Sequence, residues 1–155
     1  MIIQYPNQDL HRKSRPVELP GDLAKVQELA KEMEPYLTAT GGAAGMSAIQ
    51  LGTPICLIGL RYGMEAMFLV NPEIVWRSGD RTEYREGCIS IKYGKEFYLV
   101  VRDKMVKVRG LRLNADFMPG AVITLKVRDI LGRAVQHEID HLDGKLIIDH
   151  GRAVA

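Results

Sequence analysis

Residues 130–144 read ILGRAVQHEIDHLDG and contain the motif His-Glu-x-x-His, with His137 and His141 four positions apart. In a helix, residues i and i+4 lie one turn apart on the same face, so both imidazoles can bind one metal ion. Glu138 follows the first histidine directly, which places its carboxylate where it can take a proton from a water molecule at the metal. The motif therefore predicts a metal-binding helix.

The residues around the motif favour a helix and predict its ends. Asp129 is expected to cap the N-terminus, and Gly144 stands where a C-terminal cap falls. Two of four histidines can also fall at this spacing by chance, with a prior of roughly one in ten or less, and the glutamate would then be merely solvated. We favour the metal site. Apolar residues recur at helical spacing at Ile130, Ala134, Val135, Ile139 and Leu142.

Composition sets limits on the class of protein. A chain of 155 residues is predicted to form a single catalytic domain, 1–155, that can bury an ordinary core. The net charge of +2, with scattered lysines and arginines, does not indicate a nucleic-acid partner. No leader peptide and no membrane-spanning apolar run are visible, so we expect a cytoplasmic protein with Cys56 and Cys88 as free thiols.

The rest of the chain predicts one early helix and several strands. Residues 1–20 are expected to form an extended arm, and a helix is expected to start after Asp22. Its apolar stripe is Leu23, Val26, Leu29, Ala30, Met33 and Leu37. Strands are predicted at 54–60, 66–70, 73–77, 97–101, 106–111 and 122–127, with a turn at residues 71–72. The predicted fold class is α+β, with the central metal-binding helix packed against antiparallel β-sheets.

Residues 41–52 read GGAAGMSAIQLG and form a second unusual stretch. Glycines and small residues allow a close approach of backbone to another group, although a flexible surface turn has the same composition. Apolar residues continue the run, so we expect it to be buried and ordered. Gln50 would then need hydrogen-bond partners, one of which a substrate can supply.

A third metal ligand is needed, because a catalytic divalent ion usually takes three protein ligands and leaves one position for water. Metzincin peptidases would require a histidine where this chain has Ile147, and thermolysin-like peptidases take a glutamate from a helix well downstream, where only residues 145–155 remain. The ligand is therefore expected upstream. Cys88, in the segment EGCIS at residues 86–90, has no adjacent base and suits a metal-held thiolate. Cys56 is expected to be a small buried hydrophobe.

Three segments together resemble the motifs of the peptide deformylases: GMSAIQ at residues 45–50, EGCIS at 86–90 and QHEIDH at 136–141. They occur in the family's order and span most of the chain. The chain departs from the family pattern at Ala43, Ser47, Ile49 and Lys92, which affects the shape of the pocket rather than the chemistry. The short stretch after the metal helix resembles phage-encoded versions, for which the cytoplasm would be that of the host.

The resemblance implies a hydrolase that removes the formyl group from N-formylmethionyl peptides of nascent proteins and releases formate. It implies one divalent metal ion on Cys88, His137 and His141, with Fe(II) as the native ion and Zn, Ni or Co also suited to two imidazoles and a thiolate. The implied partners are nascent N-formylmethionyl peptides, at the ribosome, with no direct nucleic-acid contact and no membrane.

The resemblance also implies roles for individual residues. Glu138 would move the proton, while the Gln50 amide and the backbone N–H of Ile89 would stabilise the oxyanion. Glu86 and Arg102 resemble a structural ion pair, with plain surface exposure as the alternative. Two rival functions stay open: a zinc metallopeptidase of the His-Glu-x-x-His type and a non-catalytic protein with a structural metal. The substrate pocket would be lined by Ala44, Gly45, Tyr84, Ile130, Arg133 and Ala134.

Overall fold

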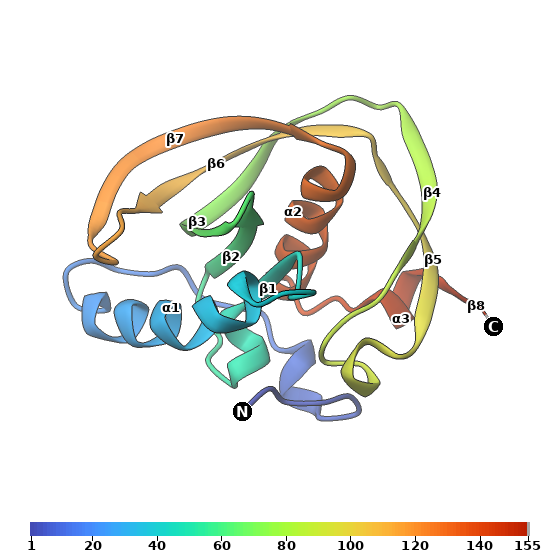
Figure 1. The fold of residues 1–155 in the computed structure, drawn as a ribbon, viewed down its shortest axis with the longest axis horizontal. Coiled ribbons are helices and arrows are strands. Elements are labelled where there is room, and N and C mark those ends of the chain that lie inside the picture. Colours follow the sequence, from blue (N-terminus) through green and yellow to red (C-terminus); the bar gives the residue numbers. More distant parts are fainter. Residues whose placement is uncertain (155) are drawn as a thin grey trace.

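The computed structural model describes residues 1–154, which form two antiparallel sheets around helix α2 (Asp129–Leu142), as Figure 1 shows. The larger sheet has the strand order β1-β2-β3-β6-β7, and the smaller sheet has the order β4-β5-β8. Helix α2 contacts strands of both sheets. The α+β class, with the motif-bearing helix packed against antiparallel sheet, is confirmed. The strands are β1 Gly45–Ser47, β2 Leu57–Tyr62, β3 Glu65–Arg77, β4 Arg81–Glu86, β5 Phe97–Asp103, β6 Met105–Leu113, β7 Pro119–Arg128 and β8 Arg152–Val154.

Helix α1 (Leu23–Thr38) covers one part of the larger sheet. It starts after Asp22, as predicted, and all of the predicted stripe except the half-buried Leu23 is buried. These side chains pack with Met46, Leu57 and Phe68 in one core cluster. Each fully buried side chain of this size contributes roughly 1.5–3 kcal/mol relative to an exposed one. The remaining short helices are η1 Gln8–His11, η2 Ala48–Leu51, η3 Lys92–Gly94 and α3 Ile147–His150.

Helix α2 lies against the inner face of the larger sheet, where Val135 and Leu142 join a core cluster with residues of β2, β3, β6 and β7. Gln136 fixes the helix to the end of β5, because its side-chain amide accepts from the backbone N–H of Asp103 and donates to the carbonyl of the same residue. Gly144 ends the helix with a φ of +74°, as its predicted capping position requires.

Ile130 lies within the helix and is 72% exposed, because it lines a cavity, as predicted, and does not pack against the sheet. One prediction about this helix was wrong. Asp129 was expected to be the N-cap, yet it is the first residue of the helix, and Arg128 occupies the cap position. The Asp129 carboxylate pairs with Arg128 at 3.3 Å instead of bonding to the free backbone N–H groups of the first turn.

Strand β3 corrects a second expectation, since the predicted turn at residues 71–72 lies inside one continuous strand. The register shifts between Val70 and Glu73, and Asn71 adopts a φ of +51°, so the chain absorbs the irregularity as a bulge. The Asn71 side chain accepts from the N–H of Val17 and donates to its carbonyl. Strands β1, β4 and β8 were not predicted.

The N-terminal segment forms the expected arm over the body of the molecule. The N–H of Ile3 donates to the carbonyl of Gln50 at 2.8 Å, and the N–H of Tyr5 donates to that of Ser90 at 2.7 Å. Between them, Gln4 Nε2 donates to the carbonyl of Ile89 at 2.7 Å. The arm therefore joins two loops that are far apart in the sequence.

The two cysteines are both free, as expected. Cys56 is half-buried rather than fully buried, and its thiol donates to the carbonyl of Ser14 at 3.6 Å. Within residues 1–154, none of the helices is both long and apolar enough to cross a membrane.

Candidate metal centre and active site

Three potential ligand atoms meet beside helix α2. One ligand atom each of Cys88, His137 and His141 lies within 4.8 Å of the other two. The Sγ of Cys88 lies 3.4 Å from Nε2 of His141, and the two imidazole rings have centroids 5.0 Å apart. Cys88 and His141 are 5% and 1% exposed. One sulfur and two imidazole nitrogens, converging in a buried site, fit a divalent transition metal ion.

The backbone around Cys88 explains how the thiol reaches the helix. Strand β4 ends at Glu86, and Gly87 follows it in contact with the aromatic ring of Phe97. A Cβ at Gly87 would lie 3.2 Å from Phe97 Cε1, so a larger residue would push the loop away from β5. The space beside Phe97 at this position therefore suits a glycine, directly before Cys88.

Glu86 orients the first histidine of the motif. Its Oε1 lies 3.0 Å from Nδ1 of His137, so Nδ1 carries the proton and Nε2 is left free to bind a metal. Arg102 donates to both carboxylate oxygens, at 2.7 and 3.0 Å, which confirms the predicted ion pair. Burial would raise the pKa of Glu86, but the hydrogen bonds from His137 and Arg102 lower it to about 2.

His141 is a neutral imidazole in this environment. The pKa of His141 lies well below its ordinary value, mainly because the side chain is buried. The positive charges of His137 and Arg102 lower it further. Its Nδ1 is buried without a hydrogen-bond partner among residues 1–154. An imidazole must be unprotonated at the ligating nitrogen to bind a metal, so His141 is in the required state.

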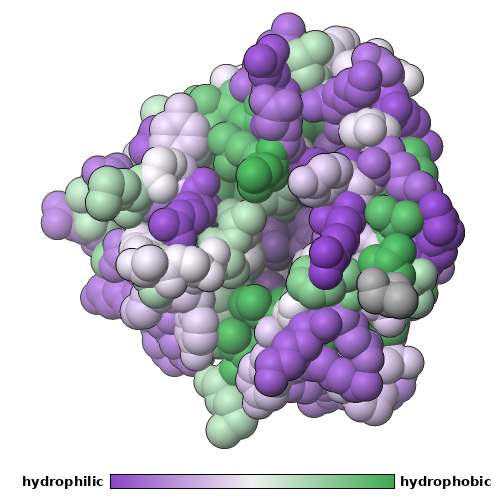
Figure 2. Space-filling model, turned by 45° about the vertical axis from the view of Figure 1, so that its right-hand side comes forward, coloured by the Kyte–Doolittle hydropathy of each residue, from purple (hydrophilic) through white to green (hydrophobic). Residues whose placement is uncertain are grey.

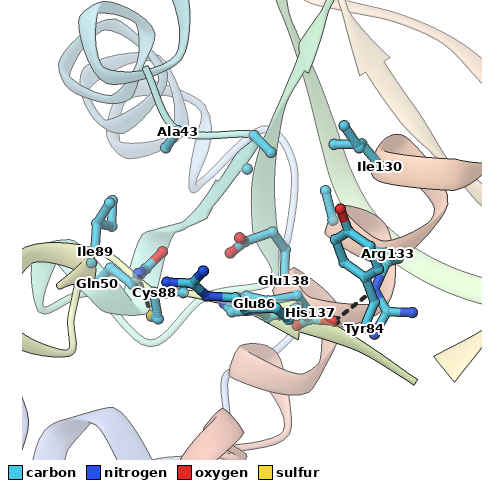
Figure 3. A pocket seen from close by; sticks show the side chains of 16 residues that line it. Ala43, Gln50, Tyr84, Glu86, Cys88, Ile89, Ile130, Arg133, His137 and Glu138 are labelled. Carbon is cyan, nitrogen blue, oxygen red and sulfur yellow. Dashed lines mark hydrogen bonds and ion pairs between the residues drawn. The ribbon is translucent and has the colours of Figure 1, made fainter. Parts of the chain in front are cut away.

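Glu138 presents a carboxylate to the same space (Figure 3). It is 3% exposed, and its Oε2 has no hydrogen-bond partner in the described part of the chain. Burial raises the pKa of Glu138 to about 7, although the positive charges of His137 and Arg102 oppose this shift. A carboxylate with such a pKa can both accept and release a proton near neutral pH.

Gly45 of strand β1 packs directly against Glu138. A Cβ at this position would lie 2.7 Å from Glu138 Cγ and 2.9 Å from Oε1, which is closer than carbon atoms approach in real structures. The glycine-rich stretch therefore allows a close approach of strand β1 to the Glu138 carboxylate. The sequence predicted such an approach for the stretch, but not which group would be approached.

Gln50 is held beside the thiol by its own turn. Its Oε1 accepts from the N–H of Ser47 at 3.0 Å, within helix η2. Its Nε2 donates to Ser90 Oγ at 3.1 Å and lies 3.6 Å from the Sγ of Cys88. The side chain is 1% exposed, so its amide is fixed next to the candidate metal ligands.

These groups line a cavity of about 340 Å³. A hollow with hydrophobic residues around it opens on the face drawn in Figure 2. All of the predicted site residues except His141, which lies behind the cavity wall, contribute to the lining. The sequence did not single out Arg85 and Gly94 as lining residues, because nothing in their spacing links them to the motifs. The lining is Ala43, Ala44, Gly45, Gln50, Tyr84, Arg85, Glu86, Gly87, Cys88, Ile89, Gly94, Ile130, Arg133, Ala134, His137 and Glu138.

A family model described as polypeptide deformylase matches residues 1–154. The chain belongs to the polypeptide deformylase family. The deformylase of Bartonella tribocorum is 35% identical over 156 residues, which cover 96% of this chain and 82% of that protein. Peptide deformylase 2 of Clostridium acetobutylicum is 39% identical over 142 residues, with coverage of 90% and 87%.

Solved deformylase structures have the same fold. A probable peptide deformylase from Synechococcus phage S-SSM7 superposes with a TM-score of 0.81 at 31% identity, covering 97% of this chain and 98% of that one. The class I type b deformylase of Acinetobacter baumannii gives a TM-score of 0.82 at 28% identity, with 96% of each chain covered. The resemblance read from three short motifs is thus confirmed over nearly the whole chain.

Proposed function

We propose that the cavity beside helix α2 is the active site of a peptide deformylase, in which Cys88, His137 and His141 hold one divalent metal ion. Membership of the family makes the protein a hydrolase that removes the formyl group from N-formylmethionyl peptides. The observation that carries the assignment is the convergence of the Cys88 thiol on the two histidines, beside a buried carboxylate with a free oxygen.

The ligand set suits Fe(II), Zn, Ni or Co, and we propose Fe(II) as the native ion because the chain resembles the deformylases in all three motifs. When bound, such an ion supplies Lewis acidity and generates a nucleophile from water at neutral pH. The protein's own contribution is to orient the imidazoles. Glu86 orients His137 through Nδ1, while burial keeps His141 neutral.

Glu138 is the proposed proton carrier. Its side chain lines the cavity, its Oε2 has no partner among the described residues, and a pKa raised by burial to about 7 lets it accept the proton of the attacking water and pass it to the leaving amine. Hydrolysis of the formamide bond leaves formate and a free α-amino group, so one proton must reach the amine nitrogen. A single carboxylate at this place can perform both transfers.

Gln50 and the backbone N–H of Ile89 are the proposed donors to the oxyanion that forms as the formyl carbon becomes tetrahedral. Gln50 Nε2 already lies beside Cys88 Sγ, and Ile89 is the next residue in the chain. Because Ser47 fixes Gln50 Oε1, the amide keeps its donor side toward the metal ligands. One such donor is typically worth roughly 3–4 kcal/mol of barrier.

The methionine side chain of the substrate is proposed to fill the part of the cavity away from Gln50. A volume of about 340 Å³ is within the range of small-molecule sites. Gly45, on strand β1, would give backbone contact to the peptide. The remaining wall of the methionine pocket is proposed to consist of Ala44, Tyr84, Ile130, Arg133 and Ala134.

We further propose that one domain, 1–155, carries the activity, and that it acts in the cytoplasm on nascent chains at the ribosome. A deformylase must meet its substrate before the N-terminus is buried by folding. The cavity is partly open to the surface, which allows an extended peptide to enter.

A formate-release assay tests the assignment and separates it from a metallopeptidase. The protein is loaded anaerobically with Fe(II) or with Ni(II), and formyl-Met-Ala-Ser is supplied as substrate. We expect stoichiometric formate and an intact Met-Ala-Ser product by mass spectrometry. Cleavage of internal peptide bonds without formate would favour the peptidase, while metal binding without either product would indicate a structural metal.

A further inference from the structure

Arg133 lines the cavity, and its guanidinium is bound by Glu86 and by two backbone carbonyls. Nε and Nη2 lie 3.1 and 2.9 Å from Glu86 Oε2, and Nη1 donates to the carbonyl of Thr82 at 3.3 Å. Nη2 also donates to the carbonyl of Val100. Figure 3 shows the guanidinium directed toward Glu86. The charged head is therefore fixed to strands β4 and β5, and the methylene stem is the part left to form the cavity wall.

The Glu86 carboxylate is consequently held from several sides. Its Oε1 accepts from His137 Nδ1 and from Arg102 Nη2, both at 3.0 Å. Its Oε2 accepts from Arg102 Nε at 2.7 Å and from Arg133. Arg102 is itself tied to helix α2, because its Nη1 donates to Asp140 at 2.8 Å. Arg133 adds a direct contact from the same helix to Glu86 Oε2, one turn before His137.

Among the described residues, Arg133 is one of three side chains that hydrogen-bond to the Glu86 carboxylate, together with Arg102 and His137. Arg102 also pairs with Asp140 at 2.8 Å, so its single positive charge is shared between two carboxylates. Arg133 supplies a second guanidinium, and its side chain is 12% exposed. Its removal would take a charged hydrogen-bond donor from a buried carboxylate, which is costly away from water.

We propose that Arg133 is a positioning residue that acts through Glu86 on His137, and that it thereby sets the metal affinity of the site. The inference rests on the proposed function in that it takes His137 as a metal ligand. In this proposal the Arg133 guanidinium makes no contact with the substrate. Arg133 therefore forms part of the wall of the methionine pocket without presenting its charge to the methionine side chain.

The test is a double-mutant cycle on zinc affinity, measured by chelator competition on metal-free protein. Arg133→Met keeps an apolar stem but removes the guanidinium, and we expect zinc binding to weaken about tenfold or more. Glu86→Gln should weaken it similarly. In the double variant, Arg133→Met should add less than about twofold to the loss caused by Glu86→Gln. Losses that multiply in full would overturn the proposal, because Arg133 would then act independently of Glu86.

Two further variants make the test specific. Arg128→Met removes an exposed arginine that lies just before α2 and pairs with its neighbour Asp129, and zinc affinity should not change. Arg133→Lys keeps the positive charge, so this variant serves as the test if Arg133→Met does not fold. A lysine cannot bridge Glu86 and two carbonyls, because its ammonium group lacks the fork of the guanidinium. We expect its zinc affinity to fall toward that of Arg133→Met, and full recovery with lysine would overturn the geometric argument.

Kinetics of the zinc- or nickel-saturated variants separate positioning from substrate contact. A positioning residue changes kcat and leaves the KM for formyl-Met-Ala-Ser within about twofold, whereas a substrate-binding guanidinium changes KM. Zinc affinity does not depend on turnover. A wild-type protein that binds zinc but releases no formate would therefore contradict the proposed function and leave the role of Arg133 intact.

Discussion

The Sγ of Cys88 lies 3.4 Å from Nε2 of His141, although 53 positions separate the two residues in the sequence. Cys88 lies two residues after the end of β4 in the smaller sheet, and His141 belongs to the helix that packs on the larger sheet. The ligand set is therefore complete only when the two sheets have closed on helix α2. This relationship makes the metal site sensitive to single side chains on either side.

Replacement of Cys88 by alanine is expected to abolish tight metal binding, because two imidazoles remain where three ligands are needed. We expect zinc affinity to fall by more than ~100-fold, beyond the usual effect of losing an outer-shell partner. Chelator competition measures it. Cys56→Ala is the matched control, since Cys56 is free, half-buried and outside the cavity, and its affinity should equal that of the wild type. Unchanged affinity in Cys88→Ala would show that another group is the third ligand.

Glu138→Ala is expected to keep the metal and lose turnover. Removal of a positioned acid–base group usually costs about 10²–10⁴ in rate, and the free Oε2 of Glu138 is the group we assign to proton transfer. Elemental analysis would establish metal content, and formate release would give kcat. Glu28→Ala, on the surface of α1, is the control for loss of a carboxylate. A Glu138→Ala protein with normal turnover would show that the proton takes another route.

Gly45→Ala tests the close approach of strand β1 to the active-site carboxylate. The added methyl group would overlap Glu138 Cγ, so the carboxylate must move, and a displacement of about 1 Å can cost ~100-fold in rate. We expect kcat to fall by that order while zinc affinity is retained. Gly21→Ala is the control, because its nearest neighbour would lie 3.7 Å away. Full activity in Gly45→Ala would mean that the carboxylate position is not critical.

The Glu86 carboxylate should make stability depend on pH in the acid range. Its pKa is lowered from 4.5 to about 2, so its contribution is fully present above pH 4.5 and is lost as the pH falls toward 2. A shift of this size corresponds to roughly 3 kcal/mol. Urea unfolding of metal-free protein at several pH values should show a smaller loss between pH 4.5 and 2 in Glu86→Gln than in the wild type. Equal slopes would mean that Glu86 is not stabilised by its charge.

The residues that meet at the candidate site were largely predictable from the sequence, because they come from short motifs. The spacing of His137 and His141 sets one helix face, and the helix periodicity predicted the element that carries them. Elimination of downstream ligands pointed to Cys88, and the structure brings its thiol to the histidines. These inferences needed only local geometry and the coordination chemistry of a divalent ion.

The parts that were missed depend on contacts between distant segments. Asn71 looks like a turn residue in sequence, but hydrogen bonds to Val17 keep it inside strand β3. The partners of the Arg133 guanidinium could not be predicted without knowledge of where the carbonyls of Thr82 and Val100 lie.

The N-terminal arm has a consequence for the order of folding during synthesis. Ile3 and Tyr5 hydrogen-bond to Gln50 and Ser90, so residues translated early have no partner until much of the chain has left the ribosome. The arm therefore docks late and closes over loops that are already in place. Proteolytic trimming of these few residues would leave every proposed metal ligand and the Glu138 carboxylate present, yet release the loops that carry Gln50 and Ile89.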